Sequence, residues 1–190
     1  MWQSFDKNEV SLLILNAIAY LIFFLLPKKF SAQITTIGLL WGLAIGILFD
    51  FTIGGGLIDF YQVNDTNHYE GSDVFYYSLF APFGYFFFYF YETFKIRKSN
   101  FNFIAYVLAW AIVGVAAQWL FTHLNIITLQ KGYRLAYSFP VFLITQTVTG
   151  LYIEVVKKQP TDVANYYVVT KRKISNLILL PFGKIKRRLR

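Results

Sequence analysis

The sequence predicts an all-α membrane protein, a bundle of five transmembrane helices. Hydrophobic residues make up 56% of the 190 residues and charged residues only 15%, whereas about a quarter of the residues in a soluble domain are charged. Five apolar stretches are each close to the roughly 20 residues that a helix needs to cross the hydrocarbon core of a bilayer. On a soluble protein, so many apolar side chains would leave large exposed patches.

The five expected helices cover about residues 10–26, 34–53, 74–94, 101–121 and 133–156. Charged residues rather than a basic region precede the first one, so we expect a retained helix and not a removed signal peptide. The second ends at Gly54-Gly55-Gly56, and the third is almost wholly aromatic. We therefore expect a transmembrane bundle over residues 1–156 and a basic tail over residues 157–190.

The distribution of basic residues predicts the orientation of the bundle. Most of them lie in the turns after the first and third helices and in the tail, and only Lys7, Lys131 and Arg134 lie in the alternate segments. Segments that are rich in Lys and Arg stay on the cytoplasmic side of a membrane. The pattern therefore predicts an outside N-terminus and a cytoplasmic C-terminus.

The tail has an apolar stretch, residues 174–183, that is too short to span a membrane and is followed by clustered cations. This pattern is typical of a segment that lies on the anionic cytoplasmic leaflet. The alternatives are a disordered tail and a docking arm for a partner protein. Nucleic-acid binding is disfavoured because the tail directly follows a spanning segment. The residues expected to bind the lipid surface are Lys171, Arg172, Lys173, Lys184, Lys186, Arg187, Arg188 and Arg190.

The second helix carries Gly38, Gly42 and Gly46 at four-residue steps. Helices in a bilayer associate through close backbone approach, which glycine permits. We interpret this face as a helix-packing surface. The fourth helix offers a matching face of small residues, Ala105, Ala109, Ala116 and Ala117.

Asp50 continues the same four-residue step, so we expect it to face the protein interior. An ion pair with Arg134, a carboxylate that reaches water or caps a backbone, and a proton or ion relay are the three interpretations. Asn16, Gln118 and Gln146 can form hydrogen bonds between helices. Alternatively, Asp50, Gln118 and Gln146 would line a polar path through the bundle.

The sequence contains no pattern that indicates an enzyme. Cysteine is absent, and the two histidines, His68 and His123, lack the spacing of a metal site. No phosphate-binding or nucleophile motif is present. We therefore expect no catalytic residue, no cofactor and no metal.

Several of these features together resemble a family of small, largely uncharacterised integral membrane proteins of spore-forming Firmicutes. The resemblance covers residues 34–158. It implies a bundle of about five helices in the bacterial cytoplasmic membrane or the spore inner membrane, and it brings no established activity. The features that carry it are Leu48-Phe49-Asp50, the following Gly55-Gly56-Leu57 and Tyr61, Pro82 in the aromatic helix, and Tyr137-Ser138-Phe139.

The resemblance implies a non-enzymatic protein of the spore inner membrane. Such a protein would modulate membrane properties, spore resistance or germination, together with other membrane proteins or further copies of itself. The alternative is a small channel or transporter for an ion or small solute that uses the polar residues inside the membrane. A lipid-modifying or intramembrane enzyme ranks last.

Overall fold

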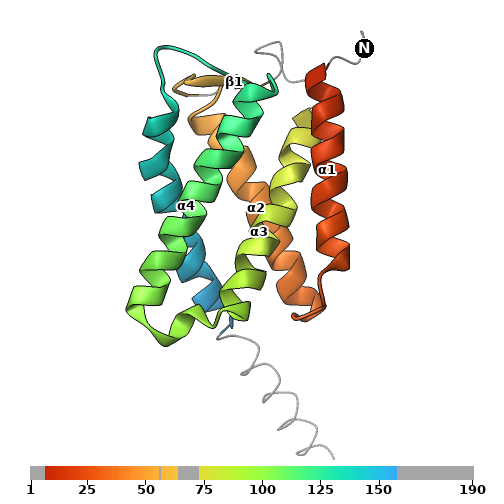
Figure 1. Cartoon of the computed structure of the whole chain (residues 1–190), viewed down its shortest axis with the longest axis vertical. Helices are drawn as coiled ribbons and strands as arrows, with labels where there is room; N and C mark the ends of the chain where they lie inside the picture. The colour runs from red at the N-terminus through yellow and green to blue at the C-terminus, as the bar shows by residue number, and fades with distance from the viewer. Residues whose placement is uncertain (1–6, 56, 64–72, 158–190) are drawn as a thin grey trace, which may run out of the picture. The chain divides into compact units, whose positions relative to one another are not determined.

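The computed structural model describes residues 7–55, 57–63 and 73–157 (Figure 1). Its long helices are α1 (Lys7–Leu25), α2 (Ala32–Thr52), α3 (Asp73–Thr93) and α4 (Asn100–His123), and a last described helix covers residues 138–157. Short elements are the 3-10 turns η1 (Ile96–Lys98) and η2 (Leu135–Tyr137) and the strands β1 (Tyr61–Val63) and β2 (Ile127–Leu129). The chain divides into two units, Met1–Gly150 and Leu151–Arg190, and all interhelical contacts given below lie within the first.

The expected all-α class fits this structure. The first four helices begin and end within a few residues of the expected bounds. The last helix starts at residue 138 rather than 133, because a turn and η2 come first. Two strands, which the sequence analysis did not anticipate, are also present.

Among the described residues, four helices are long and apolar enough to cross a membrane: Lys7–Leu25, Ala32–Thr52, Asn100–His123 and Leu135–Lys157. The expected third span, α3, is not one of them, because its tyrosines, Pro82 and Gly84 lower its mean hydropathy. It is also the helix with the most buried residues. Its aromatic side chains are therefore covered mainly by protein, and α3 does not need the fully apolar surface of a lipid-facing helix.

The other helices carry large hydrophobic side chains on their exposed faces. This arrangement is typical of a membrane-embedded protein, because lipid can cover an apolar surface that water would not. Examples are Ile14, Ile18 and Leu21 of α1, Leu40 and Leu48 of α2, Ile104 and Ile112 of α4, and Ile144 and Val148 of the last helix.

The glycine face of α2 is a packing surface, as expected, but its partner is α3. A Cβ atom on Gly42 would lie 2.1 Å from the carbonyl oxygen of Phe80, and one on Gly84 would lie 2.6 Å from Cα of Gly42. Gly38 and Gly46 face the side chains of Phe88 and Phe80 in the same way. The expected partner face on α4 is wrong, because Ala105, Ala109 and Ala116 are exposed.

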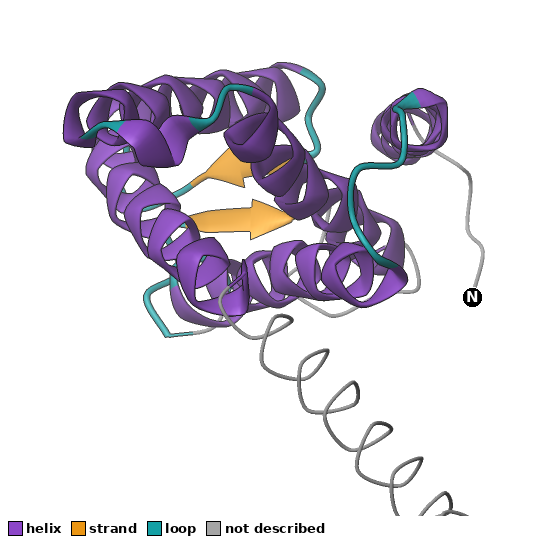
Figure 2. Ribbon diagram, turned by 90° about the horizontal axis from the view of Figure 1, so that it is seen from below, coloured by secondary structure: helices purple, strands orange, loops and turns teal. Residues whose placement is uncertain are grey.

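The remaining contacts close α2, α3, α4 and the last helix into a ring. Between α3 and α4, the Tyr106 hydroxyl donates to the carbonyl oxygen of Phe87 at 2.6 Å. Between α2 and the last helix, Trp41 Nε1 donates to Thr149 Oγ1 at 3.0 Å. The α1 helix lies outside this ring (Figure 2) and packs on α3, where Asn16 Nδ2 donates to the carbonyl oxygen of Phe75 at 2.8 Å.

The two strands pair across one end of the ring (Figure 2). They are antiparallel, with Tyr61 opposite Leu129, Gln62 opposite Thr128 and Val63 opposite Ile127. The pairing continues through the backbone N–H of Gln130, which donates to the carbonyl oxygen of Phe60 at 2.8 Å. We call this strand pair the cap.

The two described basic turns lie together at the end of the helices away from the cap (Figure 1). Lys29, which follows α1, donates a hydrogen bond to Thr93 Oγ1 at the end of α3 at 2.7 Å, and its amine lies 4.9 Å from the centre of the Tyr89 ring. The expected orientation depends on basic residues in alternate connecting segments, and these two basic segments do lie at the same end of the helices. The orientation itself stays a prediction.

Candidate functional site

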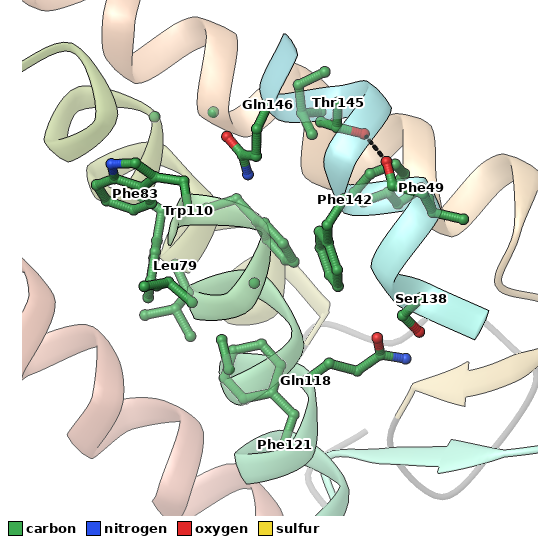
Figure 3. A pocket seen from close by; sticks show the side chains of 18 of the residues that line it. Phe49, Leu79, Phe83, Trp110, Gln118, Phe121, Ser138, Phe142, Thr145 and Gln146 are labelled. Atoms are coloured by element: carbon green, nitrogen blue, oxygen red, sulfur yellow. Dashed lines mark hydrogen bonds between the residues drawn. The ribbon is translucent and has the colours of Figure 1, made fainter. Parts of the chain in front are cut away.

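A cavity of about 120 Å³ lies inside the helix ring (Figure 3). Residues from α2, α3, α4 and the last helix line it, and the cap contributes Tyr61 and Ile127. Its walls are mainly apolar, and aromatic residues are the largest group among them. The aromatic lining residues on the helices are Trp41, Phe49, Tyr76, Phe80, Phe83, Phe87, Trp110, Phe121 and Phe142.

The cavity exists because small residues face the middle of the ring while large ones pack around its edge. Phe87 contacts the rings of Tyr106 and Trp110, with ring centres 5.0 and 5.6 Å apart, and these rings separate α3 from α4. Side chains with few atoms cannot fill the space that such large neighbours hold open. Of the small lining residues, Ala117 and Ser138 leave room in this way, whereas Gly42, Gly84 and Gly114 are in close contact with a neighbouring helix.

Two glutamines bring amide groups to this cavity, Gln118 from α4 and Gln146 from the last helix. Gln118 is buried, with 8% of its surface exposed. Within the described part of the chain, neither side-chain amide has a hydrogen-bond partner. These two side chains are therefore available to a molecule in the cavity.

This arrangement corrects the expectation that three polar residues would tie the helices together. Asn16 does so, because it donates to the carbonyl oxygen of Phe75 and accepts a hydrogen bond from Ser78 Oγ at 2.7 Å. Gln118 and Gln146 face the cavity instead. The sequence marked all three as buried polar residues, but it contained no signal that separates a helix-packing amide from a cavity-lining one.

One polar part of the cavity lies around Ser138. The Gln118 amide points toward Ser138, which opens the last helix (Figure 3). The Ser138 hydroxyl lies 3.0 Å from the hydroxyl of Tyr133, another lining residue. Tyr133 is held in turn by Phe60, whose ring stacks on it with centres 4.8 Å apart. Sequence reasoning did not select Ser138 or Tyr133 as site residues.

Asp50 faces the protein interior, as its position on the glycine face predicts, and is 5% exposed. Its Oδ2 accepts a hydrogen bond from the hydroxyl of Tyr77 on α3 at 2.5 Å. The expected ion pair with Arg134 is not formed, because Arg134 is exposed just before η2 while the glycine packing brings α3 to Asp50. Asp50 is also not among the described residues that line the cavity.

No charged side chain lines the cavity among the described residues. The same part of the chain has no group of three or more His, Asp or Glu that could hold a metal ion. His123 stacks on Trp119, with ring centres 5.6 Å apart. His68 and the expected lipid-binding residues of the tail, 171–173 and 184–190, lie outside the described residues.

The chain matches no protein-family model, no curated protein and no solved structure. The candidate site therefore depends on its own geometry, an aromatic cavity without charge and with two unpaired carboxamides.

Proposed function

We propose that the protein is an integral membrane protein that binds a small uncharged molecule in its central cavity. The observation that carries this proposal is the pair of unpartnered carboxamides, Gln118 and Gln146, in a cavity whose walls are otherwise mainly apolar. Binding sites for small molecules are typically apolar concavities with a few polar groups that orient the ligand.

The size of the cavity supports a ligand of about one ring. An engineered cavity of about 150 Å³ with apolar walls binds benzene, and this cavity measures about 120 Å³. An ion is a poor occupant, because uncharged aromatic walls cannot repay the cost of removing its water.

The alternative is a path for an ion or small solute through Asp50, Gln118 and Gln146. The two glutamines line the cavity, but Asp50 is held by Tyr77 outside it. The lining thus supports binding of a neutral molecule better than it supports an ion path. Passage of a neutral solute would begin with the same binding step.

The role that the resemblance implies, in spore resistance or germination with partner proteins, stays a prediction. Deletion of the protein in its native organism tests it, through spore heat resistance, germination rate and release of small molecules. A deletion strain with unchanged values for all three would contradict that role without bearing on the cavity.

Binding can be measured with toluene, an uncharged single-ring probe, on the protein in lipid nanodiscs. We expect toluene to raise the melting temperature of the wild type. Ala117→Phe places a ring in the cavity and should abolish the increase. Ala116→Phe adds the same ring at the neighbouring exposed position and should leave it intact.

Empty nanodiscs give the partitioning of toluene into lipid, and Ala117→Leu is a smaller cavity-filling change for use if the phenylalanine variant does not fold. An equal increase in the melting temperature of the wild type and of both Ala117 variants would overturn the proposal, because toluene would then act through the lipid.

A further inference from the structure

We propose that Gln118 and Ser138 form hydrogen bonds with a hydroxyl group of the ligand. The ligand class is therefore a single-ring aromatic alcohol of the phenol type. This inference rests on the proposed function, since it names the chemistry of the molecule that the cavity holds. It adds an orientation, with the hydroxyl toward the cap and the ring deeper among the helices.

The first step is the state of Gln118. Its side chain is more than nine-tenths buried, has no partner within the described residues and points into the cavity toward Ser138 (Figure 3). The large majority of buried side-chain polar groups in proteins are paired. Gln118 is a largely buried residue whose unpaired amide points into an open space, so the amide is available to a partner in that space.

The second step is the kind of partner that fits. A carboxamide has both a donor, its NH₂, and an acceptor, its oxygen. Ser138 also does both, and within the described residues its hydroxyl has one partner, the hydroxyl of Tyr133 at 3.0 Å. A ligand hydroxyl donates and accepts at once, so it can pair with both residues. A ketone or ether only accepts and would leave the amide oxygen of Gln118 unpaired.

The third step concerns the rest of the ligand. Beyond Ser138, the last helix presents Phe142, whose ring contacts that of Phe49 with ring centres 5.9 Å apart, and Phe83 and Trp110 also line the cavity. Aromatic walls favour an aromatic ring through offset or edge contacts. Gln146 lies eight residues after Ser138, about 12 Å along the helix axis at the usual rise per residue. A single ring whose hydroxyl is at Gln118 does not reach it.

The control position is Ala116, which is exposed and is not among the residues that line the cavity. Water is the competing occupant, because a water molecule can also pair with Gln118 and Ser138. The two occupants differ in one measurable respect. Water at this position gives no preference for a ring with a hydroxyl over a ring without one.

The experiment compares phenol with toluene. Dissociation constants are measured by ligand-observed NMR on the full chain in nanodiscs, with empty nanodiscs as the reference for partitioning. The quantity of interest is the ratio of the toluene constant to the phenol constant. We expect this ratio to fall about tenfold in Gln118→Leu, the effect of losing about 1.4 kcal/mol of hydrogen bonding. It should stay unchanged in Ala116→Leu.

The outcomes separate this inference from the proposed function. If the wild type binds toluene but the ratio is the same in Gln118→Leu, the inference is wrong and the cavity still binds a neutral ring. If the wild type binds neither probe, the proposed function fails as well. Loss of toluene binding in both Gln118→Leu and Gln118→Met, whose side chain is closer in size to glutamine, would also overturn the inference. Gln118 would then maintain the shape of the cavity instead of binding the ligand hydroxyl.

Discussion

Asp50 accepts a hydrogen bond from Tyr77 at 2.5 Å, and this contact joins the ends of α2 and α3 that lie near the cap. This hydrogen bond adds one polar contact to the close packing of the α2 glycines on α3. Gly54 completes the arrangement, because a Cβ atom there would lie 2.8 Å from Asp50 Oδ1.

The first prediction follows from this pair. Tyr77→Phe removes the only hydrogen bond to Asp50 within the described residues and leaves a buried carboxylate unpaired. We expect the free energy of unfolding to fall by about 1.5–3 kcal/mol. Arg134→Gln should change it little, since Arg134 is exposed. Thermal denaturation of the detergent-solubilised protein measures both. An equal fall in the two variants would favour the ion pair that the sequence suggested.

The second prediction concerns the seam between α2 and α3. Gly42→Ala places a methyl group 2.1 Å from the carbonyl oxygen of Phe80, so the two helices must move apart. Overpacking of this kind costs about 1–3 kcal/mol. Gly55→Ala is the matched control, because nothing lies within 4 Å of its Cβ position. Melting temperatures of the two variants should differ, and a Gly42→Ala protein as stable as the control would contradict this packing.

The third prediction concerns the register of the cap. Gln62 and Thr128 are directly opposed in an antiparallel pair, at a spacing that suits a disulfide. The chain has no cysteine, so a Gln62→Cys, Thr128→Cys variant carries only the introduced pair. We expect it to form a disulfide on mild oxidation, seen as a loss of free thiols by mass spectrometry. Gln62→Cys with Leu129→Cys should not, because neighbouring residues on a strand point to opposite faces.

The fourth prediction concerns the orientation in the membrane. Thr128 in the cap and Lys28 after α1 are both exposed and lie at opposite ends of the helices. In intact cells, a membrane-impermeant maleimide should label a Thr128→Cys variant. It should label Lys28→Cys only after the membrane is permeabilised. The reverse pattern would show that the basic turns face outward.

Much of this fold could be predicted from the lengths of the apolar stretches, because a helix in a membrane must satisfy its backbone within itself. The glycines of α2 and the inward position of Asp50 also followed from spacing. Spacing identifies a face of a helix but not the neighbour of that face. For this reason the sequence predicts the alanines of α4 as the partner of the glycines instead of Gly84 of α3, and Arg134 as the partner of Asp50 instead of Tyr77.

The cap had no usable signal in the sequence, and the cavity had only a partial one, the alternative of a polar path along Gln118 and Gln146. Tyr61–Val63 and Ile127–Leu129 are only three residues long and lie far apart in the chain, so neither shows a strand pattern by itself. The cavity depends on the angles at which four helices meet. Gln118 and Gln146 could be recognised as buried polar residues, but their lack of partners is a property of the assembled ring.

The cap has a consequence for how the protein is held together. A ribbon of two short strands is marginal in water by itself, so each half depends on the other and on the helices beneath. The segment after α2 and the segment after α4 are thus joined into one structural unit over the ring. Cleavage of the backbone in either segment should destabilise both. A molecule that left the cavity from that side would have to displace the two paired strands together.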